Sequence, residues 1–273
     1  MPRGQLAFCG NAAQSLMKIF RTFFFKGIFV IGDACVKLLL SRKACVKVWS
    51  GPFAGMNWGT HAVGSELVPK LLGTYEKELA IVIERLPVFD LVIDIGAAEG
   101  WYAVGLLYRK IARKVVAFET AGNGQEACRA NAERNSVAER LEVRGRCDVE
   151  DIRLLLHSPP RPGFRVLIVS DCEGYESELF AADVLKLCRQ AHLLIETHEL
   201  LASGAHARLA RELETSHSVT PIKPVRRTRA DAMFPGRTTP WWLRISCLRR
   251  FLLLERRGPG NNWLYAAPKI DLE

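Results

Sequence analysis

The stretch VIDIGAAEGW, residues 92–101, contains the pattern that decides the fold. An apolar run around Asp94 leads directly into Gly96, Ala97 and Gly100, which all lack bulky side chains. A turn from a strand to a helix needs small residues wherever its backbone approaches a ligand, and it leaves free N–H groups at the start of the helix. The stretch therefore predicts a strand, a ligand-binding turn and a helix, as in a nucleotide-binding cradle.

The acidic residues of this turn separate two kinds of ligand. A dinucleotide site has the pattern GxGxxG, which brings the N-terminus of a helix against an anionic pyrophosphate. Here the pattern is DxGxxxG, with Asp94 before the first glycine and Glu99 expected just inside the helix. Two carboxylates would repel a pyrophosphate, so the turn favours a ligand with a cationic end. The missing GxGxxG also counts against an NAD-dependent reductase, the nearest enzymatic alternative on fold alone.

Outward from this turn, strand-like and helix-like segments alternate. The strand-like segments are nearly continuous runs of Val, Ile and Leu, which are typical of a sheet buried on both faces. Such a sheet needs parallel strands joined by crossover helices, so the predicted fold class is α/β with a doubly wound, mostly parallel sheet. The expected strands are 89–95, 114–119, 140–145, 164–170 and 191–196, and the expected helices are 99–111, 123–135, 148–157, 176–189 and 200–214.

The composition predicts three parts of the chain. Residues 1–72 are expected to form an N-terminal extension of helices and loops, and residues 73–222 to form the ligand-binding core. Residues 223–273 contain a basic excursion followed by NWLYAAP, residues 262–268, which is expected to add a final edge strand that completes the core.

Two segments lead into the first core strand. Residues 51–73 have the glycine and proline density of a loop-rich connection. A helix is then expected from Thr74, as its N-cap, to Leu86, where Pro87 ends it. The buried face of this helix is expected to hold Leu79, Ile81, Val82 and Leu86.

A family resemblance rests on the first turn together with a second motif. The DxGxxxG turn resembles that of class I S-adenosylmethionine-dependent methyltransferases, whose cofactor carries a sulfonium and an ammonium group and no phosphate. The fourth strand ends in DCEGYE, residues 171–176. This DxEGxE run, with GTYEKEL at 73–79 and IETHE at 195–199, resembles the FkbM-like branch of these enzymes.

The resemblance implies both an architecture and a reaction. The implied architecture is a seven-stranded Rossmann-like methyltransferase sheet, in the order 3-2-1-4-5-7-6, with a helical N-terminal extension. The implied cofactor is S-adenosyl-L-methionine. The implied reaction is O-methylation of a hydroxyl group on a sugar, a glycan or a secondary metabolite, so the expected partner is a small-molecule or glycan acceptor.

Carboxylates at the strand ends are the main predicted cofactor contacts. Glu119 ends the second strand, where a carboxylate can accept hydrogen bonds from both ribose hydroxyls. Asp148 follows the third strand and is placed to meet an adenine amino group, but Glu150 and Asp151 compete for this role, and all three also suit a helix N-terminus. The predicted cofactor-binding residues are Asp94, Gly96, Ala97, Gly100, Glu119, Asp148 and Asp171.

Three residues after the fourth and fifth strands are the candidates for catalysis: Asp171, Glu173 and His198. Ligands of open α/β sheets lie beyond the carboxyl ends of the strands, so the first two should face the methyl donor or the acceptor. A base near a hydroxyl acceptor adds about 10²–10⁴-fold to the rate, and the ordinary imidazole pKa of about 6.5 suits this role. Glu196 and Glu199 offer a divalent metal site as an alternative, but their spacing is not diagnostic, and no metal is predicted.

The net charge of +9 is concentrated toward the two ends of the chain. Residues 1–50 contribute +7 and residues 223–257 contribute +8, which leaves −6 for the remainder. An RNA- or phosphate-binding surface is one interpretation of the second segment, because its basic side chains accompany Trp241 and Trp242, whose rings can stack on bases. A lid or a dimerisation arm is the favoured one. The basic side chains concerned are Lys223, Arg226, Arg227, Arg229 and Arg237.

Nucleic acid is not expected as a partner. Enzymes that methylate the amino groups of nucleobases often carry an NPPY-like tetrapeptide after the fourth strand, where this chain has DCEG. The scattered cysteines include no CxxC pair and are expected to be reduced thiols, which favours a cytoplasmic protein.

The N-terminal segment 15–40 is apolar, but charged residues interrupt it. No uncharged run approaches the roughly 18 residues that a membrane-spanning helix needs, and the segment does not fit a signal peptide. Amphipathic helices packed on the core are the favoured interpretation. Peripheral contact with an anionic membrane at its inner face is the alternative, and it admits a third kind of function, a membrane-associated protein without catalysis.

Overall fold

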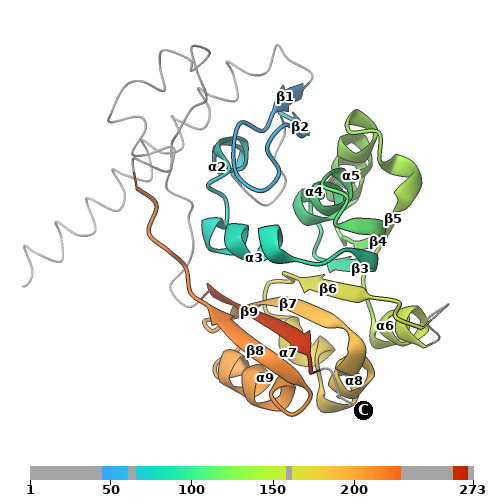
Figure 1. Ribbon diagram of the computed structural model, residues 1–273, viewed down its shortest axis with the longest axis vertical. Helices are drawn as coiled ribbons and strands as arrows, with labels where there is room; N and C mark the ends of the chain where they lie inside the picture. Colours follow the sequence, from blue (N-terminus) through green and yellow to red (C-terminus); the bar gives the residue numbers. More distant parts are fainter. Residues whose placement is uncertain (1–44, 61–65, 158–161, 229–260, 270–273) are drawn as a thin grey trace, which may run out of the picture.

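A seven-stranded sheet covered by helices on both faces forms the body of the protein (Figure 1). The computed structural model describes residues 45–60, 66–157, 162–228 and 261–269. The strands are β1 (Cys45–Lys47), β2 (Asn57–Gly59), β3 (Phe89–Ile95), β4 (Ala112–Phe118), β5 (Leu141–Arg144), β6 (Val166–Ser170), β7 (His192–His198), β8 (His217–Ile222) and β9 (Asn261–Pro268). The α-helices are α2 (Leu67–Leu72), α3 (Ala80–Arg85), α4 (Trp101–Tyr108), α5 (Gly122–Arg134), α6 (Val149–Leu156), α7 (Glu176–Leu179), α8 (Ala182–Leu187) and α9 (Ala205–Leu213). Short 3₁₀ helices are η1 (Lys77–Leu79), η2 (Ala138–Arg140) and η3 (Cys188–Gln190).

The strand order of the sheet is β5-β4-β3-β6-β7-β9-β8. When β3 is counted as the first strand, this order is 3-2-1-4-5-7-6, so the predicted Rossmann-like fold class is confirmed. The strands β3 to β7 pair in parallel with one another, and β9 pairs antiparallel with both β7 and β8. The carboxyl ends of β3 to β7 therefore meet along one side of the sheet.

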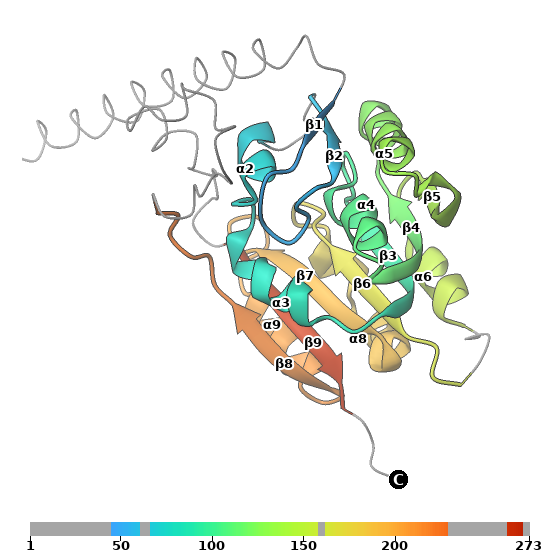
Figure 2. The same cartoon turned by 45° about the horizontal axis from the view of Figure 1, so that its top comes forward.

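The last two strands correct the sequence prediction. Residues 262–268 do form a strand, but β9 lies between β7 and β8 and is not at the edge (Figure 2). The edge is β8, which the sequence analysis did not identify because its sequence, HSVTPI, is polar and contains Pro221. Proline is tolerated in an edge strand, where one side of the backbone has no neighbour to bond. Residues 217–222 therefore form a strand because they pair with β9.

The segment before β3 also differs from its prediction. Helical structure begins at Lys77, after Glu76 in the left-handed conformation (φ 45°), so Thr74 is not an N-cap. The short helices η1 and α3 bury Leu79 and Ile83, whereas Ile81 is 61% exposed. The prediction is therefore confirmed for Leu79 and wrong for Ile81, while Val82 and Leu86 are partly buried against the core. Residues 51–73, expected to be mostly loop, contain β2 and α2.

Helices cover both faces of the sheet (Figures 1 and 2). Helices α4 and α5, together with α2 and the hairpin β1–β2, lie on one face, and α6, α8 and α9 lie on the other. On the first face the fully buried rings of Phe53 and Trp58 each meet Trp101 edge to face, with ring centroids 5.1 and 5.3 Å apart. These aromatic contacts bring the N-terminal extension onto the start of α4, next to the turn that follows β3.

A buried amide connects the extension to that turn. Asn131 on α5 is 1% exposed. Its Oδ1 accepts a hydrogen bond from the N–H of Gly59 at 2.9 Å, and its Nδ2 donates to the carbonyl of Glu99 at 3.0 Å. One side chain therefore satisfies two backbone groups, one in the hairpin and one in the turn.

Asn131→Ala should lower the free energy of unfolding by about 2–6 kcal/mol, because it leaves two buried backbone groups without a hydrogen-bond partner and each costs about 1–3 kcal/mol. Urea unfolding measures this change. The control is Asn123→Ala, on the exposed start of the same helix. Equal losses in the two variants would show that the amide of Asn131 does not connect the extension to the turn.

Among the helices of the described residues, none has the length and apolar character that crossing a lipid bilayer requires. The segment 15–40, with its predicted amphipathic helices and membrane contact, lies outside the described residues.

Candidate active site

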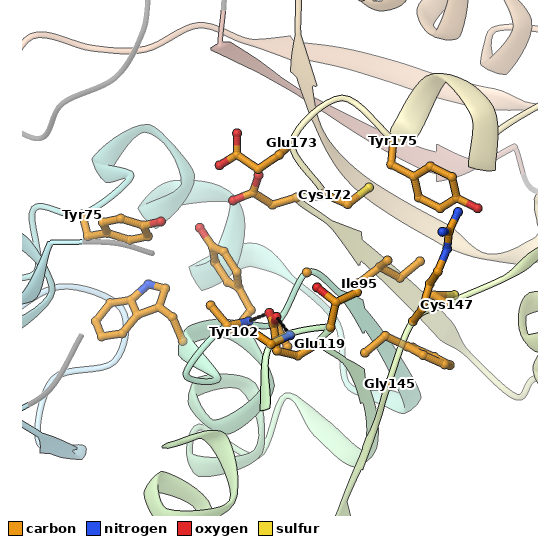
Figure 3. A pocket seen from close by; sticks show the side chains of 18 of the residues that line it. Tyr75, Ile95, Tyr102, Glu119, Gly145, Cys147, Cys172, Glu173 and Tyr175 are labelled. Atoms are coloured by element: carbon orange, nitrogen blue, oxygen red, sulfur yellow. Dashed lines mark hydrogen bonds between the residues drawn. The ribbon is translucent and has the colours of Figure 1, made fainter. Parts of the chain in front are cut away.

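A pocket of about 480 Å³ opens at the carboxyl ends of β3, β4 and β6 (Figure 3). The turns that follow β3, β4, β5 and β6 form most of its wall, and Lys70 and Tyr75 of the preceding segment complete it. Figure 3 shows Glu119 and Glu173 on opposite sides of the pocket, with Tyr75 at one end and Tyr175 at the other. This is the edge at which open α/β sheets bind their ligands.

The glycines of the turn after β3 are required by the packing of the chain itself. Gly96 has φ +82°, and a Cβ atom there would lie 1.9 Å from the carbonyl oxygen of Asp171. Gly100 has φ +87°, and a Cβ atom there would lie 2.6 Å from Sγ of Cys128. The sequence analysis attributed these small residues to a close ligand. The structure adds a neighbouring loop and helix that leave no space for a side chain.

The carboxylate of Glu119 accepts hydrogen bonds from one N–H group of this turn and one N–H group of the turn after β4. Its Oε2 accepts a hydrogen bond from the N–H of Ala98 at 2.8 Å, and its Oε1 accepts one from the N–H of Ala121 at 2.7 Å (Figure 3). Gly124 leaves room for the side chain, because a Cβ atom there would lie 2.8 Å from Cγ of Glu119. An N–H group that would face a phosphate in a dinucleotide site is therefore already bonded to a fixed negative charge.

Asp94 lies behind the wall of the pocket, at the end of β3. It is 2% exposed, and its Oδ2 has no hydrogen-bond partner among the described residues. Burial raises the pKa of this carboxyl to about 7, although a hydrogen bond from the backbone of Ala103 opposes the rise. Near neutral pH the group is close to its titration point, so a cation bound nearby would favour its ionised form.

Lys70 places a positive charge in the pocket wall beside the turn. Its ammonium group lies 2.6 Å from Oε1 of Glu99, and both side chains are almost fully buried. Rings of Trp58, Tyr75 and Trp101 surround this ammonium at 4.7–5.7 Å from their centroids. Glu99 is thus the partner of a buried lysine and precedes α4, instead of lying inside that helix as expected. The sequence analysis did not identify Lys70, because it belongs to no recognisable spacing. Tyr75 lies in the GTYEKEL motif at 73–79, but no site role was predicted for it.

Glu176 fixes the loop after β6. It is 2% exposed, and its two carboxylate oxygens accept hydrogen bonds from the N–H groups of Cys172 and Gly174 at 2.9 and 2.8 Å. Burial alone would raise the pKa of this carboxyl, but the hydrogen bonds from His198 and from the backbone lower it below the ordinary value. Within this loop Glu173 adopts the left-handed conformation (φ 52°), and its side chain is 80% exposed.

His198 lies at the centre of a group of carboxylates. Its Nδ1 is 3.1 Å from Oε1 of Glu176, and its Nε2 is 3.5 Å from Asp171, 3.6 Å from Glu173 and 3.7 Å from Glu196. Burial alone would lower the pKa of His198, but the hydrogen bond and the charge of Glu176 raise it, with help from Asp171 and Glu173.

The carboxyl of Asp171 titrates well above its ordinary range. Burial raises its pKa, and the neighbouring carboxylate of Glu196 raises it further, while the charge of His198 opposes the rise. Asp171 lines the pocket. The pocket therefore has a carboxyl in its wall whose protonated form is stabilised by its surroundings.

The structure gathers most of the predicted site residues at this edge, in two groups. The first group lines the pocket and consists of Gly96, Ala97, Glu119, Asp171 and Glu173. The second is not part of the wall and consists of Asp94, Gly100, Asp148 and His198.

The side chains of Asp148 and Glu199 each accept hydrogen bonds from N–H groups at the start of a helix. Asp148 is the N-cap of α6 in a capping box with Asp151, and its side chain is 65% exposed beside Arg146. Its neighbours Arg146 and Cys147 line the pocket in its place. Glu199 accepts hydrogen bonds from the N–H groups of Gly204 and His206, so its carboxylate serves the start of α9. Such local capping competes with any role in ligand binding.

The two cysteines of the pocket wall are poor nucleophiles. Burial raises the pKa of Cys147 to about 12, and it also raises the pKa of Cys172. Only the thiolate is a strong nucleophile, so neither residue fits covalent catalysis.

The basic segment after β8 is described only as far as Thr228. Arg227 donates a hydrogen bond to the carbonyl of Thr74 at 3.1 Å and lies 2.6 Å from Oε2 of Glu78 in a buried ion pair. It therefore anchors the segment to the core and does not belong to an exposed nucleic-acid surface. The tryptophans and the arginines from Arg229 onward lie outside the described residues.

Comparisons with known proteins add distant structural likeness. No family model matches the chain. No curated protein matches it either. The tRNA m1A22 methyltransferase TrmK of B. subtilis aligns with 70% of this chain at 12% identity and a TM-score of 0.40, and this chain covers 64% of TrmK.

Two further structures are similarly distant. Cofactor-bound Rv0187 from MTB aligns with 65% of this chain and 72% of its own, at 18% identity and a TM-score of 0.41. A putative O-methyltransferase from Klebsiella pneumoniae aligns with 70% of this chain and 78% of its own, at 12% identity and a TM-score of 0.44. At these scores the likeness carries no argument about activity, and the fold assignment stands on the strand order described above.

Asp94→Asn should change how stability depends on pH. The folded protein holds the Asp94 proton up to pH about 7, whereas the unfolded chain releases it near the ordinary pKa of 3.8. The free energy of unfolding of the wild type should therefore fall, relative to that of Asp94→Asn, by about 4 kcal/mol as the pH rises from 4 to 8. Urea unfolding across this range measures the difference. The control is Asp183→Asn, at an exposed position of α8, which should run parallel to the wild type. Parallel curves for Asp94→Asn as well would contradict the assigned burial.

Proposed function

We propose that this chain is an S-adenosylmethionine-dependent methyltransferase that methylates a hydroxyl oxygen of a sugar, a glycan or a secondary metabolite. The observation that carries the proposal is the carboxylate of Glu119, bonded to the N–H groups of Ala98 and Ala121. Each carboxylate oxygen keeps a lone pair that can accept a hydrogen bond from a ribose hydroxyl. A pyrophosphate at the same turn would face this fixed negative charge and lose the N–H group of Ala98.

The charges and polar groups around the pocket fit the methionyl end of this cofactor. Asp94 behind the turn and Asp171 in the wall favour a sulfonium and an ammonium group. Lys70 in the wall suits the carboxylate of the same cofactor. The hydroxyl of Tyr102, also in the wall, is buried and has no hydrogen-bond partner among the described residues, so a polar ligand group would satisfy it. These residues would hold the cofactor, which supplies the methyl group.

The protein contributes alignment and a base to this reaction. The acceptor oxygen forms a bond to the methyl carbon as the bond from that carbon to sulfur breaks, and the hydroxyl proton passes to a base. Alignment of two reactants contributes up to roughly 7–11 kcal/mol. We assign the base to the group Asp171, Glu173 and His198, because these side chains lie together at the pocket and a raised pKa makes the carboxylate of Asp171 a stronger proton acceptor.

Calorimetric titration of the wild type tests the proposal. S-adenosylmethionine and S-adenosylhomocysteine should bind, and NAD should not. Glu119→Ala should weaken S-adenosylmethionine binding about 10–100-fold, because hydrogen bonds to a charged group contribute about 1.5–3 kcal/mol. Thermal unfolding of the variant confirms that it folds.

The matched control removes a charge from the opposite side of the same pocket. The Kd of Glu173→Gln for S-adenosylmethionine should lie within about twofold of the wild-type value, a difference of about half a kcal/mol in binding free energy. Binding of NAD, no binding of the sulfur nucleosides, or unchanged affinity in a folded Glu119→Ala protein would each contradict the proposed function.

A further inference from the structure

Two carboxylates and one imidazole converge where β6 and β7 end. Ligand atoms of Asp171, Glu196 and His198 all lie within 4.8 Å of one another. Asp171 follows β6, while Glu196 and His198 lie on β7 with one residue between them, so they share a face of that strand. The carboxylates of neighbouring parallel strands and one imidazole therefore face a common point.

The distances from His198 to the two carboxylates are longer than ordinary hydrogen bonds and suit ligands of a metal ion. Nε2 of His198 lies 3.5 Å from Oδ1 of Asp171 and 3.7 Å from Oε2 of Glu196, beyond the usual 2.7–3.2 Å, about the range of N–H···O bonds. Nitrogen and oxygen ligands about 2.1 Å from a metal ion, at tetrahedral or octahedral angles, lie about 3.0–3.4 Å apart. A small inward movement of the side chains would place all three around one ion.

A second observation concerns the orientation of His198. Its side chain is 5% exposed, and Nδ1 lies against the ionised carboxylate of Glu176, which the loop amides hold in place. Metal-binding histidines are oriented in the same manner, by a carboxylate on the ring nitrogen that does not bind the metal. When Nδ1–H donates its hydrogen bond to Glu176 and the ring is neutral, the lone pair of Nε2 faces Asp171 and Glu196.

Oδ1 of Asp171, the atom that faces Nε2, is buried and has no hydrogen-bond partner among the described residues. A buried lone pair opposite two carboxylates is unfavourable unless a positive charge lies between them. A proton or a metal cation can supply that charge, and three ligand atoms directed at one point favour the metal.

We propose that Asp171, Glu196 and His198 bind one divalent metal ion of the kind that accepts mixed nitrogen and oxygen ligands, such as Mn²⁺. Asp171 also lines the pocket, so the remaining coordination positions face the space between the turns. An acceptor oxygen can occupy one of them. Because Asp171 and His198 are then metal ligands, Glu173 is the member of the proposed base group that takes the acceptor proton. This role in orienting the acceptor rests on the proposed function, whereas the binding of the ion does not.

Titration of chelator-treated protein with Mn²⁺, followed by electron paramagnetic resonance, tests the site. The wild type should bind one Mn²⁺ per chain, and pulsed spectra should show coupling to a nitrogen nucleus from His198. Glu196→Gln should weaken binding at least about tenfold. The control is Glu84→Gln, an exposed carboxylate of α3, which should bind as the wild type does.

Three results would overturn the proposal: no stoichiometric binding by the wild type, bound Mn²⁺ without nitrogen coupling, or an equal loss in Glu84→Gln. The first two need no variant, so they remain decisive if Glu196→Gln does not fold. Calorimetry with S-adenosylmethionine on the same metal-free sample separates the two proposals. Cofactor binding without Mn²⁺ binding would remove the metal site alone, and Mn²⁺ binding without cofactor binding would remove the proposed function alone.

Discussion

The close packing of Gly96 against the carbonyl of Asp171 is the constraint on which the rest of the site depends. It presses the turn after β3 onto the loop after β6 with no room for a side chain. Because these loops follow adjacent parallel strands, the packing places the Glu119 side of the pocket opposite the group of His198 and its carboxylates. One backbone contact thus sets the separation between the turn and the group of His198 and its carboxylates, and the proposed transfer reaction requires rigid positioning of this kind.

Around this contact the protein concentrates negative charge and balances it locally. Glu119 is satisfied by backbone amides, Glu99 by Lys70 and Glu176 by the loop that it holds. Asp94 and Asp171 instead keep raised pKa values, because burial removes water and no comparable partner replaces it. A cationic ligand would stabilise their ionised forms. The N-terminal extension takes part in this balance, since it supplies the buried ammonium group.

The sequence predicted the sheet because its central strands are buried on both faces and therefore read as apolar runs. Strand β8 contains no such run. It forms because it pairs with β9, which lies more than forty residues later in the chain. Gly96 was predicted from local turn chemistry, although the backbone that crowds it comes from another loop. Lys70 could not be predicted, because its role follows from the tertiary packing of aromatic rings around it. At Asp148 the local preference for capping a helix, visible in the sequence, accounts for the position of the side chain.

A crystal structure of the chain with S-adenosylhomocysteine would test the central claim most directly, that the acidic turn holds a sulfur nucleoside. The account predicts both ribose hydroxyls within hydrogen-bond distance of the Glu119 carboxylate and the sulfur atom directed toward Asp171. A nucleoside bound elsewhere, or a phosphate group on the N–H of Ala98 with Glu119 displaced, would contradict it.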